Sequence, residues 1–147
     1  MNLKDFSQED LLAVCLWAEA RGEPEEGQQG VCNVILNRVK KGMAEGISAV
    51  ILKPNQFSWT SPKDPNYAKV FTAKEDDPDG WKGAMSIAQK ALAGELGDVT
   101  QNADHYLNVE AARKQRGGKL PKWAEEGIRT GKVTVVIGRH TFLNLLG

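Results

Sequence analysis

The chain has 147 residues, of which 41% are hydrophobic and 26% are charged, and its 19 basic and 19 acidic side chains leave a net charge of zero. This length is typical of one domain with its own core, so we expect a single catalytic domain spanning residues 1–147. The balanced charge argues against a nucleic-acid partner, and no window approaches the ~20 consecutive apolar residues of a membrane-spanning helix, which argues against stable membrane association.

The N-terminal segment and the cysteines indicate where the chain is made. Asp5 and Glu9 precede any long apolar stretch, unlike a secretory signal peptide, so we expect synthesis in a cytoplasm. Cys15 and Cys32 lie in apolar helical contexts, which favours two reduced core thiols over a disulfide. With two histidines and no close Cys/His spacing, we expect no metal and no cofactor.

Two amphipathic helices are predicted near the N-terminus. The first should run over residues 8–20, with Ser7 as its N-cap and Gly22 stopping it at the C′ position. The second should begin with Pro24 at its first position and close at Gly42. Apolar residues recur at helical spacing in both segments, which predicts a buried face for each helix.

The middle of the chain is less regular. Residues 47–52 fit either a short helix or a strand. Residues 53–80 hold four of the six prolines together with several aromatic residues, and long ordered loops are usually functional. We interpret this stretch as an ordered arm over a cleft, with a short helix near residues 67–71, followed by a longer helix over residues 80–95.

The C-terminal third is predicted to contain a small sheet. "ADHYLN", residues 103–108, alternates weakly and fits an extended segment, whereas Pro121 fits the start of a short helical turn. Residues 132–145 indicate two strands around a hairpin at Gly138–Arg139. The predicted fold class is therefore α+β, mainly helical, with a small antiparallel sheet.

The stretch "WAEARGE", residues 17–23, carries the sharpest chemical hypothesis. Glu19 falls in the last turn of the first helix, where the helix dipole and apolar neighbours such as Trp17 should raise the pKa of its carboxyl group. A general acid acting on a glycosidic oxygen needs a proton held near neutral pH. An ion pair with Arg21 would oppose this shift, and the alternative is an exposed glutamate. Glu23 is either a helix cap or a second catalytic carboxylate.

Two further stretches combine amide, hydroxyl and aromatic groups, namely "NQFSWT", residues 55–60, and "DHYLN", residues 104–108. Polar groups beside flat apolar faces suit a sugar, which offers hydroxyl edges and a C–H face. The alternatives are that Phe57 and Trp59 plug the core and that His105 is a hydrogen-bonded structural histidine.

Taken together, several blocks resemble one family. "WAEARGEPEEGQQGVCNVILNRV", "PNQFSWT", "ADHYLN", "PKWAE" and "VIGRHTF" occur in this order between about residues 9 and 143. They resemble the SleB/CwlJ-type cell wall hydrolases, which degrade spore cortex during germination. Several ordered blocks make this resemblance more specific than any single motif.

The resemblance implies a lysozyme-like α+β fold and cleavage of peptidoglycan glycan strands between N-acetylmuramic acid and N-acetylglucosamine. It places the catalytic glutamate on Glu19, while the role of Glu23 stays open. The expected substrate-binding residues are Gln56, Phe57, Ser58, Trp59, His105, Tyr106 and Asn108. The reaction is that of a lytic transglycosylase or of a muramidase, and the latter usually needs a second carboxylate, for which Glu23 and Asp104 are the candidates.

The germination enzymes carry an export signal and often a separate wall-binding domain, and this sequence shows neither pattern. We therefore expect a monomeric bacteriophage endolysin that accumulates in the bacterial host cytoplasm and reaches peptidoglycan after holin release, or alternatively a bacterial or prophage autolysin. The rival class is a non-catalytic peptidoglycan-binding or phage structural module on the same fold. An amidase or peptidase is a third class, but it usually needs zinc or a Cys/His pair.

Overall fold

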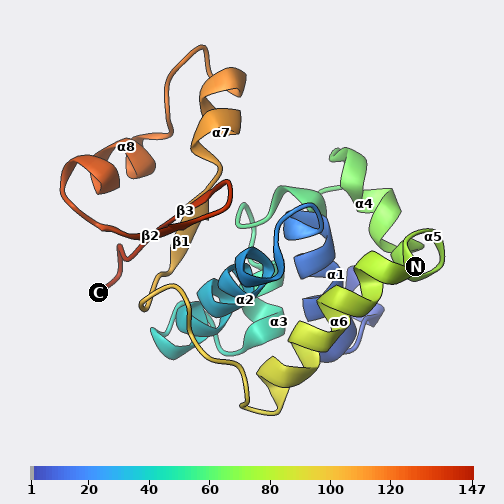
Figure 1. The fold of residues 1–147 in the computed structure, drawn as a ribbon. Helices are drawn as coiled ribbons and strands as arrows, with labels where there is room; N and C mark the ends of the chain where they lie inside the picture. Colours follow the sequence, from blue (N-terminus) through green and yellow to red (C-terminus); the bar gives the residue numbers. More distant parts are fainter. Residues whose placement is uncertain (1) are drawn as a thin grey trace.

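The computed structural model describes residues 2–147. The helices in chain order are η1 (Leu3–Asp5), α1 (Gln8–Ala20), α2 (Glu25–Lys40), α3 (Ile47–Leu52), η2 (Ser58–Thr60), α4 (Pro65–Val70), α5 (Ala73–Asp76), α6 (Pro78–Leu92), α7 (Val109–Gln115) and α8 (Lys122–Arg129). The strands are β1 (His105–Leu107), β2 (Val133–Ile137) and β3 (His140–Leu143). Figure 1 shows the helices α1 to α6 gathered in one part, and the three strands with α7 and α8 in a second part beside it.

Helix α1 is the central helix of the first part. The Ser7 hydroxyl caps it by accepting the Asp10 N–H at 3.0 Å, as predicted. Every residue from Leu11 to Trp17 is at most 5% exposed, because α2, α3 and α6 all pack against this helix. The expectation of a single buried face is therefore wrong for α1, which is buried all round and places Glu19 at its C-terminal end.

The turn between α1 and α2 follows the prediction closely. Arg21 is the C-cap of α1, so Gly22 occupies the predicted C′ position, and Pro24 is the N-cap of α2, one residue before the predicted position. Gly42 follows the end of α2 with a φ of 82°, a left-handed conformation that glycine adopts without strain. Cys32 on α2 and Cys15 on α1 are both buried and unpaired, which confirms the prediction of reduced core thiols.

The proline-rich segment is ordered, as predicted. Residues 47–52 form helix α3, and the short helix predicted near residues 67–71 is α4. Phe71 stacks on Phe6 with 5.7 Å between ring centroids and meets the Tyr67 ring edge-on at 5.3 Å. These contacts hold α4 against the N-terminal segment, and the predicted helix over residues 80–95 follows as α6.

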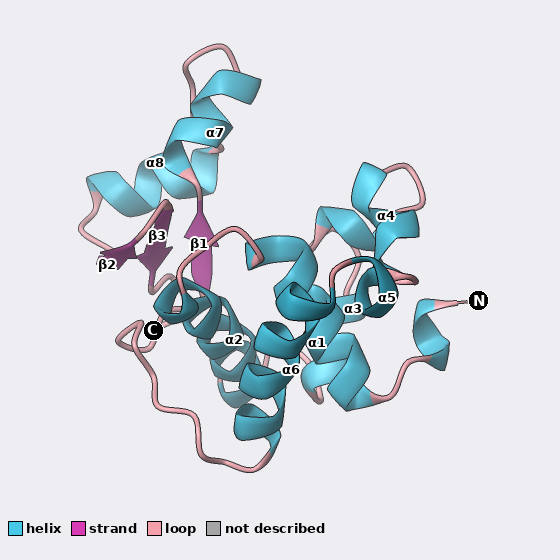
Figure 2. Cartoon of the chain, turned by 45° about the vertical axis from the view of Figure 1, so that its right-hand side comes forward, coloured by secondary structure: helices cyan, strands magenta, loops and turns pink. Residues whose placement is uncertain are grey.

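The sheet is antiparallel with strand order β1-β3-β2, and β2 and β3 form the predicted hairpin. Tyr106 on β1 pairs with Phe142 on β3, which faces helix α2 so closely that a Cβ on Gly30 would lie 2.6 Å from its ring. Figure 2 shows β1 beside α2, where the sheet meets the helical part. Helix α7 was not predicted, because none of its residues is buried and its seven residues are too few for a helical repeat to stand out.

Candidate active site

A cavity of about 620 Å³ lies between the helical part and the sheet. Its wall is built from the end of α1, from α2, from the loop before η2, from β1 and β3, and from α7 and α8. Seven of the predicted site residues line it, namely Glu19, Gln56, Phe57, Ser58, His105, Tyr106 and Asn108. The tertiary structure therefore brings together the three separate stretches that the sequence singled out.

Glu19 is the only carboxyl group among the described residues that lines this cavity. The Tyr106 hydroxyl donates a hydrogen bond to its Oε1 atom. Burial raises the pKa of Glu19, and the negative charge of Asp64 adds to this effect, whereas the Tyr106 hydrogen bond and the positive charge of Arg38 oppose it. The net direction is upward, as predicted, so Glu19 keeps its proton to a higher pH than an exposed glutamate.

Arg21 does not pair with Glu19. Its guanidinium lies over the Trp17 ring at 4.1 Å and donates hydrogen bonds to the backbone oxygens of Trp17 at 3.1 Å and Ala18 at 3.4 Å. A further hydrogen bond reaches the Asn66 side chain at 3.2 Å. Because Arg21 is occupied with the C-terminal carbonyls of α1, its charge does not counteract the raised pKa of Glu19.

Glu23 lies outside the cavity and contacts the β2–β3 hairpin. Its carboxylate accepts the Arg139 backbone N–H at 3.0 Å and the Arg139 Nε–H at 2.7 Å. Burial by itself raises the pKa of Glu23, but these hydrogen bonds outweigh it and lower the pKa below its usual value. Gly138 adopts a φ of 59°, and a Cβ at this position would lie 2.9 Å from Oε1 of Glu23, so the turn and the carboxylate fit closely. This placement favours a structural role that joins the first turn to the hairpin.

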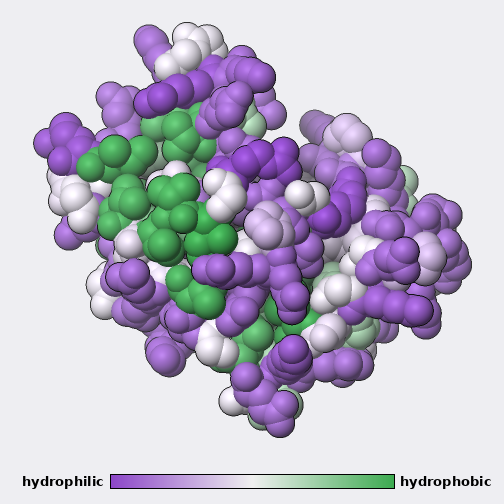
Figure 3. Space-filling model, in the orientation of Figure 1, coloured by the Kyte–Doolittle hydropathy of each residue, from purple (hydrophilic) through white to green (hydrophobic). Residues whose placement is uncertain are grey.

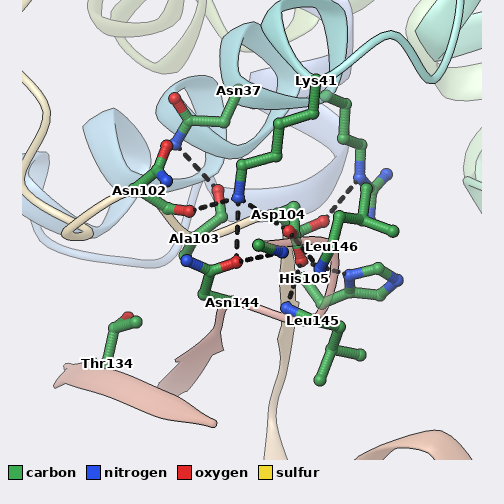
Figure 4. Close-up of polar contacts among 12 residues, drawn as sticks. Asn37, Lys41, Asn102, Ala103, Asp104, His105, Thr134, Asn144, Leu145 and Leu146 are labelled. Carbon is green, nitrogen blue, oxygen red and sulfur yellow. Dashed lines mark hydrogen bonds and ion pairs between the residues drawn. The ribbon is translucent and has the colours of Figure 1, made fainter.

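Asp104 is completely buried and organises the junction of α2, β1 and the C-terminal segment (Figure 4). Its carboxylate accepts hydrogen bonds from Lys41 at 2.8 Å and from the backbone N–H groups of Leu145 at 2.9 Å and Leu146 at 2.8 Å. It also contacts Nδ1 of His105 at 2.7 Å. Burial alone would raise the pKa of Asp104, but these contacts lower it to about 2. Asp104 is therefore an anchor that orients His105 toward the cavity.

Trp59 lies in the core and does not line the cavity. It is 1% exposed, and its indole N–H has no oxygen or nitrogen partner among the described residues. Phe57, two residues earlier, is also buried but contributes to the cavity wall. For Trp59 the structure thus favours the alternative in which the side chain plugs the core, since a buried ring offers no face to a sugar.

The cavity wall also includes residues outside the three stretches 17–23, 55–60 and 104–108. Arg38 on α2 and His140 on β3 are 6% and 7% exposed and line the cavity, as does Trp123, whose ring lies 5.2 Å from that of His105. The Arg38 Nε–H donates to the Asp104 carbonyl oxygen at 2.7 Å. All three lie inside the ordered sequence blocks quoted above, which is the one signal that pointed to them.

Two imidazole groups, those of His105 and His140, line the cavity. No group of three or more His, Cys, Asp or Glu side chains in residues 2–147 is arranged as a metal site. Burial lowers the pKa of His140, so this imidazole stays neutral at neutral pH and contributes no charge to the cavity.

Over residues 2–147, no helix combines the length and apolar character that crossing a membrane requires.

Comparison with known proteins places the chain in a family. A family model described as Cell Wall Hydrolase matches residues 22–143, which is most of the chain. The chain therefore belongs to the cell wall hydrolase family, in agreement with the resemblance noted in its sequence.

The curated relatives are spore cortex-lytic enzymes. The protein of this name from Oceanobacillus iheyensis is 33% identical over 117 residues, which cover 73% of this chain and 35% of the relative. The one from Bacillus cereus is 32% identical over 143 residues, which cover 93% of this chain and 45% of the relative. The chain thus spans less than half the length of these two relatives.

Two solved structures share the fold. The catalytic domain of the germination-specific lytic transglycosylase SleB from Bacillus anthracis matches with a TM-score of 0.65 and 28% identity, covering 95% of this chain and 98% of that domain. The catalytic domain of the Bacillus cereus SleB protein matches with a TM-score of 0.63 and 27% identity over 95% and 92%. The predicted lysozyme-like α+β fold, mainly helical with a small antiparallel sheet, is confirmed.

Proposed function

We propose that this protein cleaves peptidoglycan glycan strands between N-acetylmuramic acid and N-acetylglucosamine, and that it does so as a lytic transglycosylase. The observation that carries the proposal is a single carboxyl group with a raised pKa, Glu19, in a cavity lined by amide, hydroxyl and aromatic side chains. Family membership and the likeness to a lytic transglycosylase domain support the same reaction.

The proposed reaction uses Glu19 twice. The protonated carboxyl donates its proton to the glycosidic oxygen, and the bond from this oxygen to C1 of the muramic acid breaks through an oxocarbenium-like state. The resulting carboxylate then accepts the proton of the muramic acid 6-hydroxyl while that oxygen attacks C1. The products are a 1,6-anhydro end and a free N-acetylglucosamine end, and Glu19 is protonated again.

Over residues 2–147 the cavity wall holds no second carboxylate beside Glu19, which favours the transglycosylase over the muramidase. A hydrolase usually places a second carboxylate about 5–9.5 Å from the acid to act as nucleophile or to activate water. Among the described residues, both candidates, Glu23 and Asp104, are held by hydrogen bonds outside the cavity. Asp64 is the remaining acidic neighbour, and its carboxylate caps α4 by accepting the Asn66 N–H at 2.8 Å.

Mass spectrometry of digested peptidoglycan tests the reaction directly. Purified sacculi incubated with the protein should release muropeptides that end in 1,6-anhydro-muramic acid. Reducing muramic acid ends would instead establish a muramidase, and free stem peptides an amidase. Asp64→Asn should keep the anhydro products, whereas loss of turnover in this variant would assign Asp64 the role of a second catalytic carboxylate.

Glu19→Gln tests whether this carboxyl group is the proton donor. Loss of the proton donor should reduce sacculus digestion at least ~10²-fold, since general acid catalysis contributes about 10²–10⁴. The fold should persist, because burial disfavours the ionised carboxylate and an uncharged amide of the same size removes this cost. The raised pKa means that the contribution of Glu19 to stability is complete below pH 4.5 and is lost as the pH rises through the folded-state pKa. Melting temperature at pH 7 should therefore be unchanged or higher in the variant.

The same variant separates the enzyme from the non-catalytic module. If sacculi bind both forms equally and neither releases muropeptides, the protein is a binding module. The exposed Glu26→Gln substitution on α2 is the matched control and should retain full digestion.

The proposed function includes the route by which the enzyme reaches the cell wall. We propose an endolysin that is held in the host cytoplasm until a holin opens the membrane, as expected from the sequence. Expression in a Gram-negative host with and without a co-expressed holin tests this route: lysis only with the holin supports it, and lysis without the holin contradicts it.

A further inference from the structure

The net charge of zero conceals an uneven distribution along the chain. Residues 1–104 hold 16 of the 19 acidic and 11 of the 19 basic side chains, whereas residues 105–147 hold 3 and 8. The helical part therefore has a net charge of −5, and the part that begins with β1 has a net charge of +5. The two parts lie side by side (Figure 1), and both contribute residues to the cavity wall. The cavity therefore lies between a part with a negative net charge and a part with a positive net charge.

The positive charge of the second part is concentrated in one segment. Residues 113–122 contain five basic and no acidic side chains, and all five are exposed: Arg113, Lys114, Arg116, Lys119 and Lys122. We call these five residues the basic arm. Within residues 2–147, only Lys114 of the five has an ion-pair partner, Glu110 at 3.7 Å. The other four cations are therefore free to bind an external anion.

The basic arm lies at the rim of the cavity. Gln115, which is within the same segment, lines the cavity, and Arg116 lines an adjoining hollow together with Glu19, Gln56 and Ser58. Trp123, directly after the arm, lies with its ring tilted against that of His105, so the end of the arm is next to the cavity wall. An extended molecule that passes Glu19 and leaves the cavity on this side therefore meets Arg116.

We propose that the basic arm binds free carboxylates of the stem peptides carried by the glycan strand in the cavity. This inference rests on the proposed function, because it takes peptidoglycan as the substrate. The sugar backbone of peptidoglycan is uncharged, and its free carboxylates are on the peptides attached to muramic acid. Guanidinium and ammonium groups bind carboxylates through charge-assisted hydrogen bonds. The negative helical part repels the same peptides, so the charge difference also orients the strand.

The test removes three charges of the arm that do not line the cavity. Arg113→Gln/Lys119→Gln/Lys122→Gln should raise the KM for untreated sacculi about tenfold at low salt and leave kcat unchanged, since each exposed ionic contact contributes modestly. The difference from wild type should shrink as salt is added, because screening weakens exposed charge pairs. Lys69→Gln/Lys82→Gln/Lys90→Gln, which removes three exposed charges from the helical part, is the matched control and should keep the wild-type KM.

A second substrate identifies the anion. Sacculi whose stem-peptide carboxylates have been converted to methylamides should give wild type and the arm variant the same, higher KM. A variant that is impaired equally on untreated and amidated sacculi would overturn the inference, because the arm would then not recognise carboxylates. An effect confined to walls that still carry teichoic acid, or to anionic vesicles, would overturn it in favour of a phosphate ligand.

Sedimentation with sacculi separates this inference from the proposed function. In the Glu19→Gln background, binding without turnover should still weaken about tenfold in the arm variant. If wild type releases no muropeptides but binding still depends on the arm, the basic arm binds sacculi and the proposed glycosidase reaction is wrong. Equal binding of the arm variant and the lysine control would overturn the inference about the basic arm, whichever products wild type releases.

Discussion

The Glu19–Tyr106 hydrogen bond joins two elements in the cavity wall. Tyr106 comes from β1 and donates its hydroxyl hydrogen bond to a carboxyl group at the end of α1. This bond favours the ionised form of Glu19 and therefore partly offsets the effect of burial on its pKa. Tyr106 both holds the Glu19 carboxyl group and limits how far its pKa rises.

Tyr106→Phe should shift the pH dependence of the reaction. Without the hydroxyl donor the pKa of Glu19 should rise further. The rate, which in the proposed reaction requires protonated Glu19, should then fall at a higher pH than in wild type. The pH profile of kcat/KM on sacculi measures this limb. Tyr67→Phe is the matched control, because Tyr67 packs against Phe71 and does not line the cavity. A Tyr106→Phe profile with an unchanged or lower alkaline limb would contradict the role assigned to the hydroxyl.

Glu23→Gln distinguishes a structural from a catalytic glutamate. Loss of the charge should weaken the contact with Arg139, which is largely exposed, and should lower the stability by about 1 kcal/mol, or roughly 2–4 °C in Tm. Because the pKa of Glu23 is lowered, this contribution is present above pH 4.5 and is lost as the pH falls through the folded-state pKa. The kcat should be close to wild type, and a ~100-fold lower kcat would instead make Glu23 catalytic.

The elements meet at the Asp104 network. The carboxylate of this residue connects Lys41 near the end of α2 with the start of β1 and the segment after β3. Nearby, the Lys41 ammonium also contacts the Asn102 carbonyl at 2.7 Å and the Asn144 side chain at 3.0 Å. These bonds hold β1 against α2, and β1 carries His105 and Tyr106 into the cavity.

Asp104→Asn should destabilise the whole fold. Removing one partner of a buried, hydrogen-bonded ion pair costs about 3 kcal/mol, which corresponds to roughly 6–12 °C in Tm. The pKa of Asp104 is lowered to about 2, so its contribution to stability is present above pH 3.8 and is lost as the pH falls toward 2. Thermal denaturation between pH 2 and pH 7 measures both effects. Asp79→Asn, at an exposed position on α6, should change Tm little, and an equally stable Asp104→Asn variant would contradict the network.

The molecule as a whole has an apolar area on the side of the sheet. Figure 3 shows hydrophobic residues gathered over the region that holds the strands and α8 in Figure 1. Two exposed apolar side chains come from this part of the chain, namely Val136 on β2, which is 60% exposed, and Leu146 after β3, which is 51% exposed. Among the described residues β2 is an edge strand, and an exposed apolar edge is prone to self-association.

Val136→Lys should reduce pairing of this edge with a second copy of the chain at high protein concentration. A charge on the edge strand disfavours pairing with a second edge, while the exposed position tolerates a long side chain. Light scattering at increasing protein concentration should show less association than wild type, with a Tm within about 2 °C. Association that is unchanged in the variant would show that β2 is not the surface through which copies meet.

Local sequence signals were sufficient for most helices and strands. Ser7, Pro24, Gly42 and Gly138 mark caps and turns because their preferences depend on one residue's own backbone and side chain. Apolar periodicity predicted the hairpin and the long helices, because it too can be read from a short stretch of sequence. It did not predict α7, which has no buried residue. It gave α1 one buried face, because the sequence does not show that α2, α3, α4 and α6 surround this helix.

The environment of Glu19 depends on contacts between residues far apart in the chain. The sequence alone identified Glu19 as a candidate, and the order of matching blocks raised it above an exposed glutamate. In the folded chain, Tyr106 donates a hydrogen bond to the Glu19 carboxyl group, and Arg21 donates to a backbone carbonyl at the end of α1. Glu23 accepts hydrogen bonds from Arg139 in the hairpin. Tertiary packing also buries Trp59. Burial and the partner of a charge are properties of the packed chain, so a local pattern proposes a reactive group and the fold determines its pKa and its neighbours.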